Sequence, residues 1–332
     1  MSSDSCSSFQ DLFTGDCEVV QPVCETVQTS CGIIEDDIDK VPGYIEFSEM
    51  KRRFRVEDYS KSDANGSFGD IFFGIDLSNS LEVAIKRIPH NKKSQKQKSR
   101  SPKEILPEFT IPWSLDSRNL CKVYAFSIDE EYFYIVMEKI QGKEAFDFFC
   151  ENPKFAQKNP LTMKAILLEI ANGLSILHGA GYAHRDIKLE NVILTFDESG
   201  KFLRAVIIDF GFASCVSDIP LGSKQGTLHY GAPEIFKGDN QLTEKVDMWA
   251  LGVFIFLSIY NHYPIDSRQK ERRLAVLEIT HRLLSLKALS MPVLENIQKN
   301  VNHLVRICKR CLEIEPSSRI SSADLVEILA SD

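Results

Sequence analysis

The pattern of apolar residues changes character near residue 140, and this change limits the folds open to the chain. Before it, short runs rich in β-branched and aromatic residues, such as EVAIKRI at 82–88, are separated by Gly, Asn and Ser, which is typical of antiparallel strands. After it, apolar residues recur at helical spacing, as in LTMKAILLEIANGLSILHGAG at 161–181. The sequence therefore predicts an α+β protein, with a small strand-rich lobe followed by a larger helical lobe.

The acidic excess of the chain lies in its first 40 residues, which carry nine acidic groups and one lysine. The remainder is neutral overall and offers no basic excess for binding nucleic acid. Because the acidic segment is rich in Ser, Asp and Cys without sustained periodicity, we expect residues 1–45 to form a flexible tail. The predicted organisation is this tail, a small lobe at 46–140 and a large lobe at 141–332.

The nine cysteines predict neither a disulfide framework nor a metal site. Cys308 and Cys311 form a single CxxC on a predicted amphipathic helix, so we interpret them as structural thiols. Because the cysteines are odd in number and scattered, we expect a reducing compartment. Because the N-terminus lacks a basic start followed by an apolar run, we expect no signal peptide. The longest apolar stretch, at 248–260, is shorter than the roughly 20 residues of a membrane span. We therefore expect a soluble, cytoplasmic protein that contacts no membrane.

A basic stretch at 86–103 contains eight Lys or Arg residues and no acid. We interpret it as a solvated loop. The alternative is a nuclear-import signal or a docking patch, which would add the nucleus to the expected locations.

Charged residues crowd against a buried strand in AHRDIKLENVIL at 183–194. Its HRD and Asn191, followed by DFG at 209–211, resemble the catalytic and metal-binding loops of protein kinases. Further kinase-like motifs occur in the expected order, namely NGSFGDIFFG at 65–74, VAIK at 83–86, GAPE at 231–234, DMWALG at 247–252 and EPSSR at 315–319. Any one of them arises by chance, but the ordered set makes residues 53–330 similar to a protein kinase. The resemblance implies a bilobal fold with its site in the cleft between the lobes.

The resemblance implies a phosphoryl-transfer site, where charge must be positioned and neutralised more than bonded covalently. Asp186 would orient the proton of the attacking hydroxyl, and Lys188 would reach the transferring phosphate. Asn191 and Asp209 would hold Mg²⁺, or Mn²⁺, through oxygen ligands. Lys86 would contact the α- and β-phosphates of ATP. The apolar strands beside these loops would hold them rigidly.

The resemblance also implies which residues surround the nucleotide. The glycine loop departs from the family's pattern, because Ala64 stands where the first glycine is usual, whereas Gly66 and Gly69 are kept. We expect nucleotide binding to survive, since the backbone approaches phosphate most closely at the second glycine. The expected nucleotide-binding set comprises Ala64, Asn65, Gly66, Ser67, Phe68, Gly69, Ala84, Lys86, Glu108, Met137, Glu138, Ile140, Glu144, Asn191 and Asp209.

A glutamate is expected to pair with Lys86, and two candidates are available. Glu108 is favoured because Leu115 follows it at the family's spacing, and Glu104 is the alternative. Pro112 lies four residues after Glu108, and a proline inside a helix removes a hydrogen bond and kinks or ends the helix. This departure from the family's pattern leaves the Lys86–Glu108 pair open at the level of sequence.

Three other charged residues match positions that have structural roles in this family. Glu234 and Arg319 match a pair that forms a buried salt bridge in the second lobe. Asp247 matches a residue that holds the backbone of the catalytic loop.

Lys188 and Thr227 resemble the serine/threonine branch of the family. Glu144 and Glu190 match acidic positions that basophilic kinases use against substrate arginines, whereas Leu257 stands at the third such position. The likeness leans to the calcium/calmodulin-kinase or Pim-like branches. We therefore expect a monomeric kinase whose protein substrates carry a basic residue about three positions before the acceptor Ser or Thr.

A protein of a different class remains as the alternative, a pseudokinase scaffold that binds partners through the tail or the basic loop. The presence of the complete catalytic set favours the enzyme; this set is Lys86, Asp186, Asn191 and Asp209. The resemblance also places the family's primary phosphorylation site at Ser223, where a phosphate would pair with Arg185. The alternative reading of Ser223 is a solvated loop hydroxyl in a segment that is always ordered.

Overall fold

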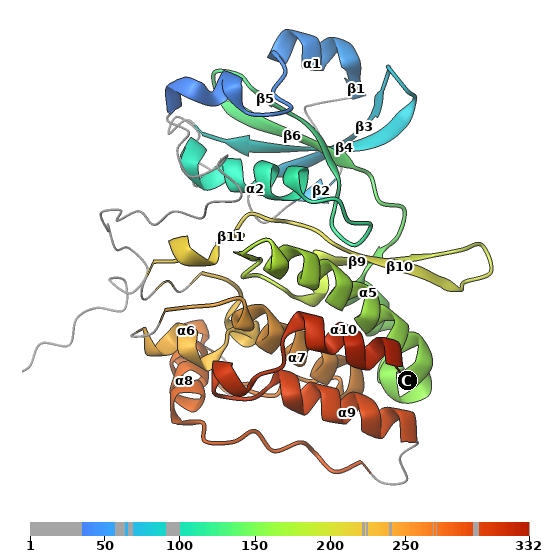
Figure 1. The fold of residues 1–332 in the computed structure, drawn as a ribbon, viewed down its shortest axis with the longest axis vertical. Helices are drawn as coiled ribbons and strands as arrows, with labels where there is room; N and C mark the ends of the chain where they lie inside the picture. Colours follow the sequence, from blue (N-terminus) through green and yellow to red (C-terminus); the bar gives the residue numbers. More distant parts are fainter. Residues whose placement is uncertain are drawn as a thin grey trace, which may run out of the picture.

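The small lobe is built on one antiparallel sheet. In the computed structural model the described residues are 35–56, 64–65, 69–90, 100–220, 223, 225–238, 241–267, 269, 271–294 and 299–331. The strands of the sheet are β1 (Phe54–Val56), β2 (Ala64–Asn65), β3 (Asp70–Asp76), β4 (Leu81–Pro89), β5 (Val123–Ile128) and β6 (Tyr132–Glu138). They lie in the order β1-β3-β4-β6-β5, and β2 pairs with β3. Helix α2 (Pro102–Ser114) lies beside this sheet, on the side that faces the second lobe (Figure 1).

The end of the expected tail is part of the small lobe. Residues 1–34 of the tail lie outside the described residues, but Glu35–Lys40 forms a 3₁₀ helix, and α1 (Phe47–Arg53) follows. Between them the chain runs parallel to β5, with the amide of Ile45 bonded to the carbonyl of Phe126 at 2.9 Å. Val41 is buried against α2 and β5. The boundary at residue 45 therefore falls within packed structure. The sequence does not predict this packing, because the segment contains too few apolar residues.

The large lobe is mainly helical. Its helices are α3 (Ala145–Glu151), α4 (Phe155–Lys158), α5 (Pro160–Gly179), α6 (Pro233–Lys237), α7 (Lys245–Tyr260), α8 (Arg272–Ser285), α9 (Lys299–Cys311) and α10 (Ser322–Ser331). Short 3₁₀ turns are η3 (Leu189–Asn191), η4 (Val216–Asp218), η5 (Leu228–Tyr230) and η6 (Pro316–Ser318). The strand-rich lobe thus precedes the helical lobe, as the change of pattern near residue 140 predicts (Figure 1).

Helix α7 forms the centre of the large lobe. Almost every one of its side chains is buried, which explains why the apolar run at 248–260 shows no polar face. Cys308 and Cys311 on α9 are buried against the same core, and burial raises the pKa of the Cys311 thiol to about 12. Helix α5 alone among the described helices is long and apolar enough to cross a membrane, and half of that stretch is buried inside the protein.

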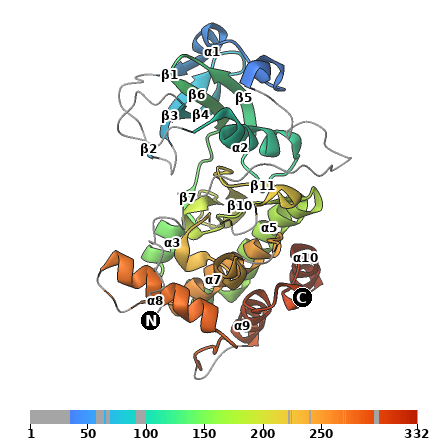
Figure 2. The ribbon, with the colours of Figure 1, turned by 90° about the vertical axis from the view of Figure 1, so that its left-hand side faces the viewer.

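Short strands at the top of the large lobe bring its loops to the seam between the lobes. They are β7 (Lys143–Glu144), β8 (Tyr182–Ala183), β9 (Val192–Phe196), β10 (Phe202–Ile207) and β11 (Ser214–Cys215). Strands β10, β9 and β7 form one antiparallel sheet, and β11 pairs with β8. In the side view the two lobes lie one above the other, with β7 and β10 close to the boundary (Figure 2).

Candidate active site

The catalytic loop between β8 and η3 is fastened to the core by Asp247 of α7. The carboxylate of Asp247 accepts hydrogen bonds from the backbone amides of His184 and Arg185, both at 2.7 Å. A further bond at 3.0 Å joins Asp247 to the ring of His178. Arg185 has a left-handed backbone with φ 67°, a conformation that L-residues other than glycine rarely adopt without support. The structural role expected for Asp247 is therefore present.

Asp186 is held at both of its carboxylate oxygens. Lys188 Nζ lies 2.7 Å from Oδ2, and Asn191 Nδ2 donates to the same oxygen at 3.0 Å. The hydroxyl of Thr227 donates to Oδ1 at 2.8 Å. An aliphatic hydroxyl within hydrogen-bond distance of this carboxylate is the arrangement that phosphoryl transfer to Ser or Thr requires. The amide nitrogen of Asn191 is used by Asp186, so its amide oxygen is the atom suited to a cation.

Lys86 of β4 connects the two lobes through carboxylates. Its ammonium contacts Glu108 of α2 and lies 2.8 Å from Asp209 Oδ1, in the loop after β10. Burial alone would lower the pKa of Lys86, but the two carboxylates raise it above its ordinary value. Burial would raise the pKa of Asp209, and Lys86 instead brings it down to about 2. Lysine and aspartate are therefore both charged.

Glu108, and not Glu104, pairs with Lys86 in the structure. Glu104 instead forms a capping box with Ser101 at the start of α2, accepting from the Ser101 amide at 2.8 Å. The helix continues through Pro112 to Ser114 and contains a second internal proline, Pro107. Burial raises the pKa of Glu108, although Lys86 acts in the opposite direction.

A cavity of about 670 Å³ between the lobes brings most of the expected site residues together. Those that line it are Ala84, Lys86, Glu108, Met137, Glu138, Ile140, Glu144, Lys188, Asn191 and Asp209. This volume lies within the usual range of small-molecule sites, roughly 300–1,000 Å³. No group of three His, Cys, Asp or Glu in the described part of the chain is arranged as a metal site. A cation at Asp209 and Asn191 would thus complete its shell with phosphate oxygens and water, which is how Mg²⁺ is usually held. The donor set fits Mg²⁺ with a nucleoside triphosphate.

The structure describes only part of the expected glycine loop. Gly66, Ser67 and Phe68 lie outside the described residues. Ala64 and Asn65 form β2 and pair with Ile71 and Asp70. At Gly69 a Cβ atom would collide with the carbonyl oxygen of Arg87 on the neighbouring strand, so this glycine serves the packing of β3 on β4. Gly69 is not among the described residues that line the cavity.

Some apolar residues of the cavity wall lie outside the expected set, in addition to Ala84, Met137 and Ile140, which belong to it. Ile71 of β3 lines it from the small lobe, and Ile193 of β9 lines it from the large lobe. Each follows a motif residue at a fixed offset, Ile71 two residues after Gly69 and Ile193 two residues after Asn191. That offset is the signal from which they could have been found. Cys121 also lines the cavity, and burial raises the pKa of its thiol to about 12.

Acidic side chains lie at the large-lobe side of the cavity. Glu144 and Glu190 both line it, and Glu190 Oε2 is buried without a hydrogen-bond partner among the residues that the structure describes. Burial, then Asp147 and Glu190, raise the pKa of Glu144, and Lys188 opposes them. The two carboxylates therefore lie next to the catalytic loop, close enough to Lys188 for its charge to act on Glu144.

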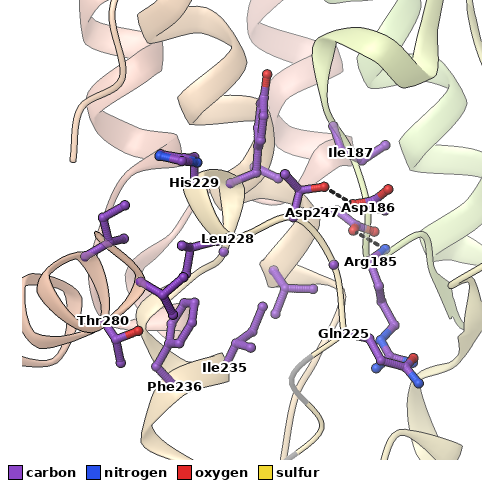
Figure 3. A pocket seen from close by; sticks show the side chains of 18 of the residues that line it. Arg185, Asp186, Ile187, Gln225, Leu228, His229, Ile235, Phe236, Asp247 and Thr280 are labelled. Carbon is purple, nitrogen blue, oxygen red and sulfur yellow. Dashed lines mark hydrogen bonds between the residues drawn. The ribbon is translucent and has the colours of Figure 1, made fainter. Parts of the chain in front are cut away.

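A second cavity, of about 540 Å³, adjoins Asp186 (Figure 3). Arg185, Asp186 and Ile187 lie at one side of it, and Leu228, His229, Ile235 and Phe236 lie at the other (Figure 3). At Gly231 a Cβ atom would come within 2.7 Å of the Phe236 ring, so the glycine lets this ring pack beneath the segment that carries Thr227. The polar end of the cavity is thus the catalytic loop and its floor is apolar.

Arg185 joins the catalytic loop to the segment that contains Ser223. Its guanidinium donates to the Ser223 hydroxyl and, at 3.1 Å, to the Ser214 hydroxyl. Burial lowers the pKa of Arg185 to about 10. Asp247 opposes this effect of burial, and the acceptors that the guanidinium reaches among the described residues are neutral. A buried cation with such partners is suited to accept a further negative charge.

Comparison with known proteins agrees with this geometry. A probable serine/threonine-protein kinase of Dictyostelium discoideum is 28% identical over 268 residues, which are 80% of this chain and 30% of that protein. Calcium-dependent protein kinase 4 of Plasmodium falciparum is 28% identical over 264 residues, covering 79% of this chain and 47% of the relative. Calcium-dependent protein kinase 5 of Plasmodium berghei is 30% identical over 224 residues, 67% and 37% of the two chains.

The chain thus spans about a third to a half of the length of these curated relatives. A family model described as the protein kinase domain matches residues 64–329, which include most of both lobes and every loop of the site. The chain belongs to the protein kinase domain family.

Proposed function

We propose that the protein is a serine/threonine protein kinase, which transfers the γ-phosphate of ATP to Ser and Thr hydroxyls of proteins. The observation that carries this proposal is the carboxylate of Asp186, which accepts the Thr227 hydroxyl at 2.8 Å and lies 2.7 Å from Lys188. Relatives that are named as serine/threonine or calcium-dependent protein kinases support the same reading.

Each charged group has a distinct task in this reaction. Asp186 would orient the attacking hydroxyl and accept its proton, and Lys188 would stabilise the charge on the transferring phosphate. Lys86, fixed by Glu108, would hold the α- and β-phosphates. Asp209 and the amide oxygen of Asn191 would hold Mg²⁺, which bridges phosphate oxygens and neutralises their charge.

Substrates with a basic residue upstream of the acceptor are favoured by the acidic pair. Glu144 and Glu190 line the cavity beside the catalytic loop, and Glu190 has a buried oxygen without a partner among the described residues. A substrate arginine could satisfy both carboxylates through charge-assisted bonds. The apolar floor of the second cavity would suit an apolar substrate residue close to the acceptor.

Replacement of the two aspartates tests the proposal. In Asp186→Ala, transfer from labelled ATP to an arrayed peptide library should fall by roughly a hundredfold or more, while ATP binding is kept. In Asp209→Ala transfer should fall similarly, and the affinity for Mg-ATP should fall with it because a metal ligand is lost. Asp116→Ala, at an exposed aspartate after α2, is the matched control.

Unchanged turnover in Asp186→Ala would contradict the kinase mechanism. A wild-type protein that binds nucleotide but phosphorylates no peptide would favour the pseudokinase scaffold instead.

A further inference from the structure

Arg100 lies immediately before helix α2 and reaches acceptors on both lobes, of which three lie among the described residues. Its guanidinium donates to Glu108 Oε2 at 3.3 Å, to the carbonyl oxygen of Gly211 at 2.8 Å and to the carbonyl oxygen of Glu104. We propose that Arg100 is a positioning residue that couples Glu108 to the loop of Asp209, so that both sides of the nucleotide site are held in register. This inference rests on the proposed kinase function.

The location of Arg100 is not explained by the helix that it precedes. Ser101 is the N-cap of α2, so Arg100 stands just outside the helix N-terminus, where the helix dipole disfavours a cation. Its side chain nevertheless folds back over the helix and is largely buried. The acceptors that it reaches, and not helix capping, account for an arginine at this position.

The arginine completes the charge balance of a buried cluster. Lys86 contacts two carboxylates, those of Glu108 and Asp209, and one ammonium cannot neutralise both. Arg100 brings a second cation to Glu108, since Lys86 contacts Oε1 and Arg100 contacts Oε2. A carboxylate held at both oxygens keeps one orientation, whereas an unbalanced buried charge is costly.

Glu108 needs this support because the backbone of α2 is weakened around it. Pro107 precedes it directly, and Pro112 has no amide to donate to the Glu108 carbonyl. A contact that starts before the first turn and ends at Glu108 spans the turn that Pro107 weakens, and it fixes the side chain of the residue whose carbonyl Pro112 leaves without an amide donor. Arg100 thus restrains Glu108 in a part of α2 where prolines reduce the number of helical hydrogen bonds.

The bond to Gly211 extends the restraint into the large lobe. Gly211 lies two residues after Asp209, and its amide donates back to Asp209 Oδ1 at 3.3 Å. Asp209 has a left-handed backbone with φ 61°, so the turn that carries it depends on its neighbours for support. By binding the Gly211 carbonyl, Arg100 connects this turn to α2.

Two substitutions of Arg100 in the full chain test the inference. Arg100→Met should raise the KM for ATP, and weaken calorimetric binding of the Mg complex of a non-hydrolysable ATP analogue, by about tenfold, the effect of one charge-assisted hydrogen bond. The KM for peptide should stay within about twofold, since the peptide side of the site is untouched. Arg100→Lys should recover part of the loss, because an ammonium keeps the charge but not the fork that reaches Glu108 and Gly211 together.

Arg53→Met is the matched control, because Arg53 forms an ion pair with Asp76 at 2.8 Å in the same lobe and away from the cleft. It should leave nucleotide affinity unchanged. In a Glu108→Gln background Arg100→Met should add no more than about twofold, since Arg100 acts through that carboxylate.

Wild-type nucleotide affinity in Arg100→Met, or a full tenfold loss that persists in the Glu108→Gln background, would overturn the coupling. Failure of the proposed function is a separate result: the wild type would then phosphorylate no peptide, while the affinity series would still decide the role of Arg100.

Discussion

Glu144 and Glu190 bring two carboxylates to the side of the cleft where a peptide would meet the catalytic loop. Partial burial, then the charges of Asp147 and Glu190, raise the pKa of Glu144, so this group loses its charge at a higher pH than an ordinary glutamate. An attraction to substrate arginine that depends on Glu144 must weaken as the pH falls towards that raised pKa. The charge of arginine itself does not change in this range.

The preference for an upstream arginine should therefore depend on pH. The ratio of kcat/KM for an arginine-containing peptide to that for its alanine analogue should be about tenfold near pH 7.5 and should fall on going to about pH 5.5. Taking the ratio cancels the titration of catalytic groups common to both peptides. Glu144→Gln should give a smaller ratio that is flat with pH, and a wild-type ratio that rises on acidification would exclude this role.

The hydroxyl of Ser223 contacts the buried guanidinium of Arg185. A phosphate there would add roughly −1.5 to −2 charge to a site that already holds a cation. We expect phosphatase treatment of protein from its own cells to lower activity, Ser223→Ala to match the treated protein, and mass spectrometry to find the phosphate at this residue. Equal activity before and after treatment would mean that the neutral hydroxyl is sufficient.

At this scale the sequence predicts polar residues better than apolar ones. Asp186, Asn191 and Asp209 are recognisable because their chemistry permits few substitutes at their spacing. Ile71 and Ile193 escape notice, since one apolar wall residue resembles any other residue of a strand. Arg100 escapes for another reason: one of its partners, Gly211, is 111 residues away, and only the tertiary fold brings the two together.

Among the elements, α2 depends most on its surroundings. Two prolines interrupt its hydrogen bonding, and the helix is held by the capping box at its start and by packing of Phe109 and its neighbours on β5. The segment that includes Val41 covers the same apolar surface and pairs with β5. Helix α2 is therefore stabilised more by tertiary contacts than by its own backbone, as is usual for helices in proteins.

Truncation of Val41 should test this dependence. Val41 is 3% exposed, so Val41→Ala should lower the free energy of unfolding by about 1–3 kcal/mol and should also weaken nucleotide binding, because α2 carries Glu108. Val293→Ala is the control, since Val293 is 92% exposed and its loss should change neither quantity. Denaturant unfolding and calorimetry measure the two effects. A loss of stability with unchanged nucleotide affinity would show that the segment does not position α2.

Two features of the small lobe could not be predicted from the sequence, the packing of residues 35–45 and the continuity of α2 through Pro112. The expectation of a flexible tail up to residue 45 rests on acidic composition, and the few apolar residues at 35–45 give no periodicity from which packing could be inferred. Pro112 argues for a kinked or shortened helix, yet α2 passes through it because neighbouring strands cover the helix. Local propensity was overridden by tertiary packing in both places.

The molecule as a whole consists of two lobes of different construction, a sheet above and a helical core below (Figure 2). Lys86 and Arg100 reach from the small lobe to one loop of the large lobe. Lys86 contacts Asp209 in that loop, and Arg100 contacts the carbonyl of Gly211. Within the large lobe, Arg319 is fully buried and binds Glu234 at 2.6 Å, as the sequence resemblance implies. It also donates to the carbonyl of Lys245, at the start of α7.

Breaking that buried pair should destabilise the whole large lobe. Arg319→Met should cost about 3–5 kcal/mol, because Glu234 would be left charged and buried. The double variant Glu234→Met with Arg319→Met should cost less than the sum of the single changes, since it leaves no unpaired charge. Arg118→Met is the exposed comparison, with an ion pair at 3.5 Å whose loss should cost less than about 1 kcal/mol. Equal costs for Arg319→Met and Arg118→Met in urea unfolding would refute this account.

The attachment of the catalytic loop to Asp247 has a consequence for the energetics of turnover. The amides of His184 and Arg185 are bound by a carboxylate that belongs to the central helix of the core, so the left-handed turn before Asp186 is set when the large lobe folds. Charged and dipolar groups that are already oriented need no rearrangement when charge develops on the reacting atoms. The free-energy cost of orienting the catalytic loop for phosphate transfer therefore arises once, during folding, and does not recur in each catalytic cycle.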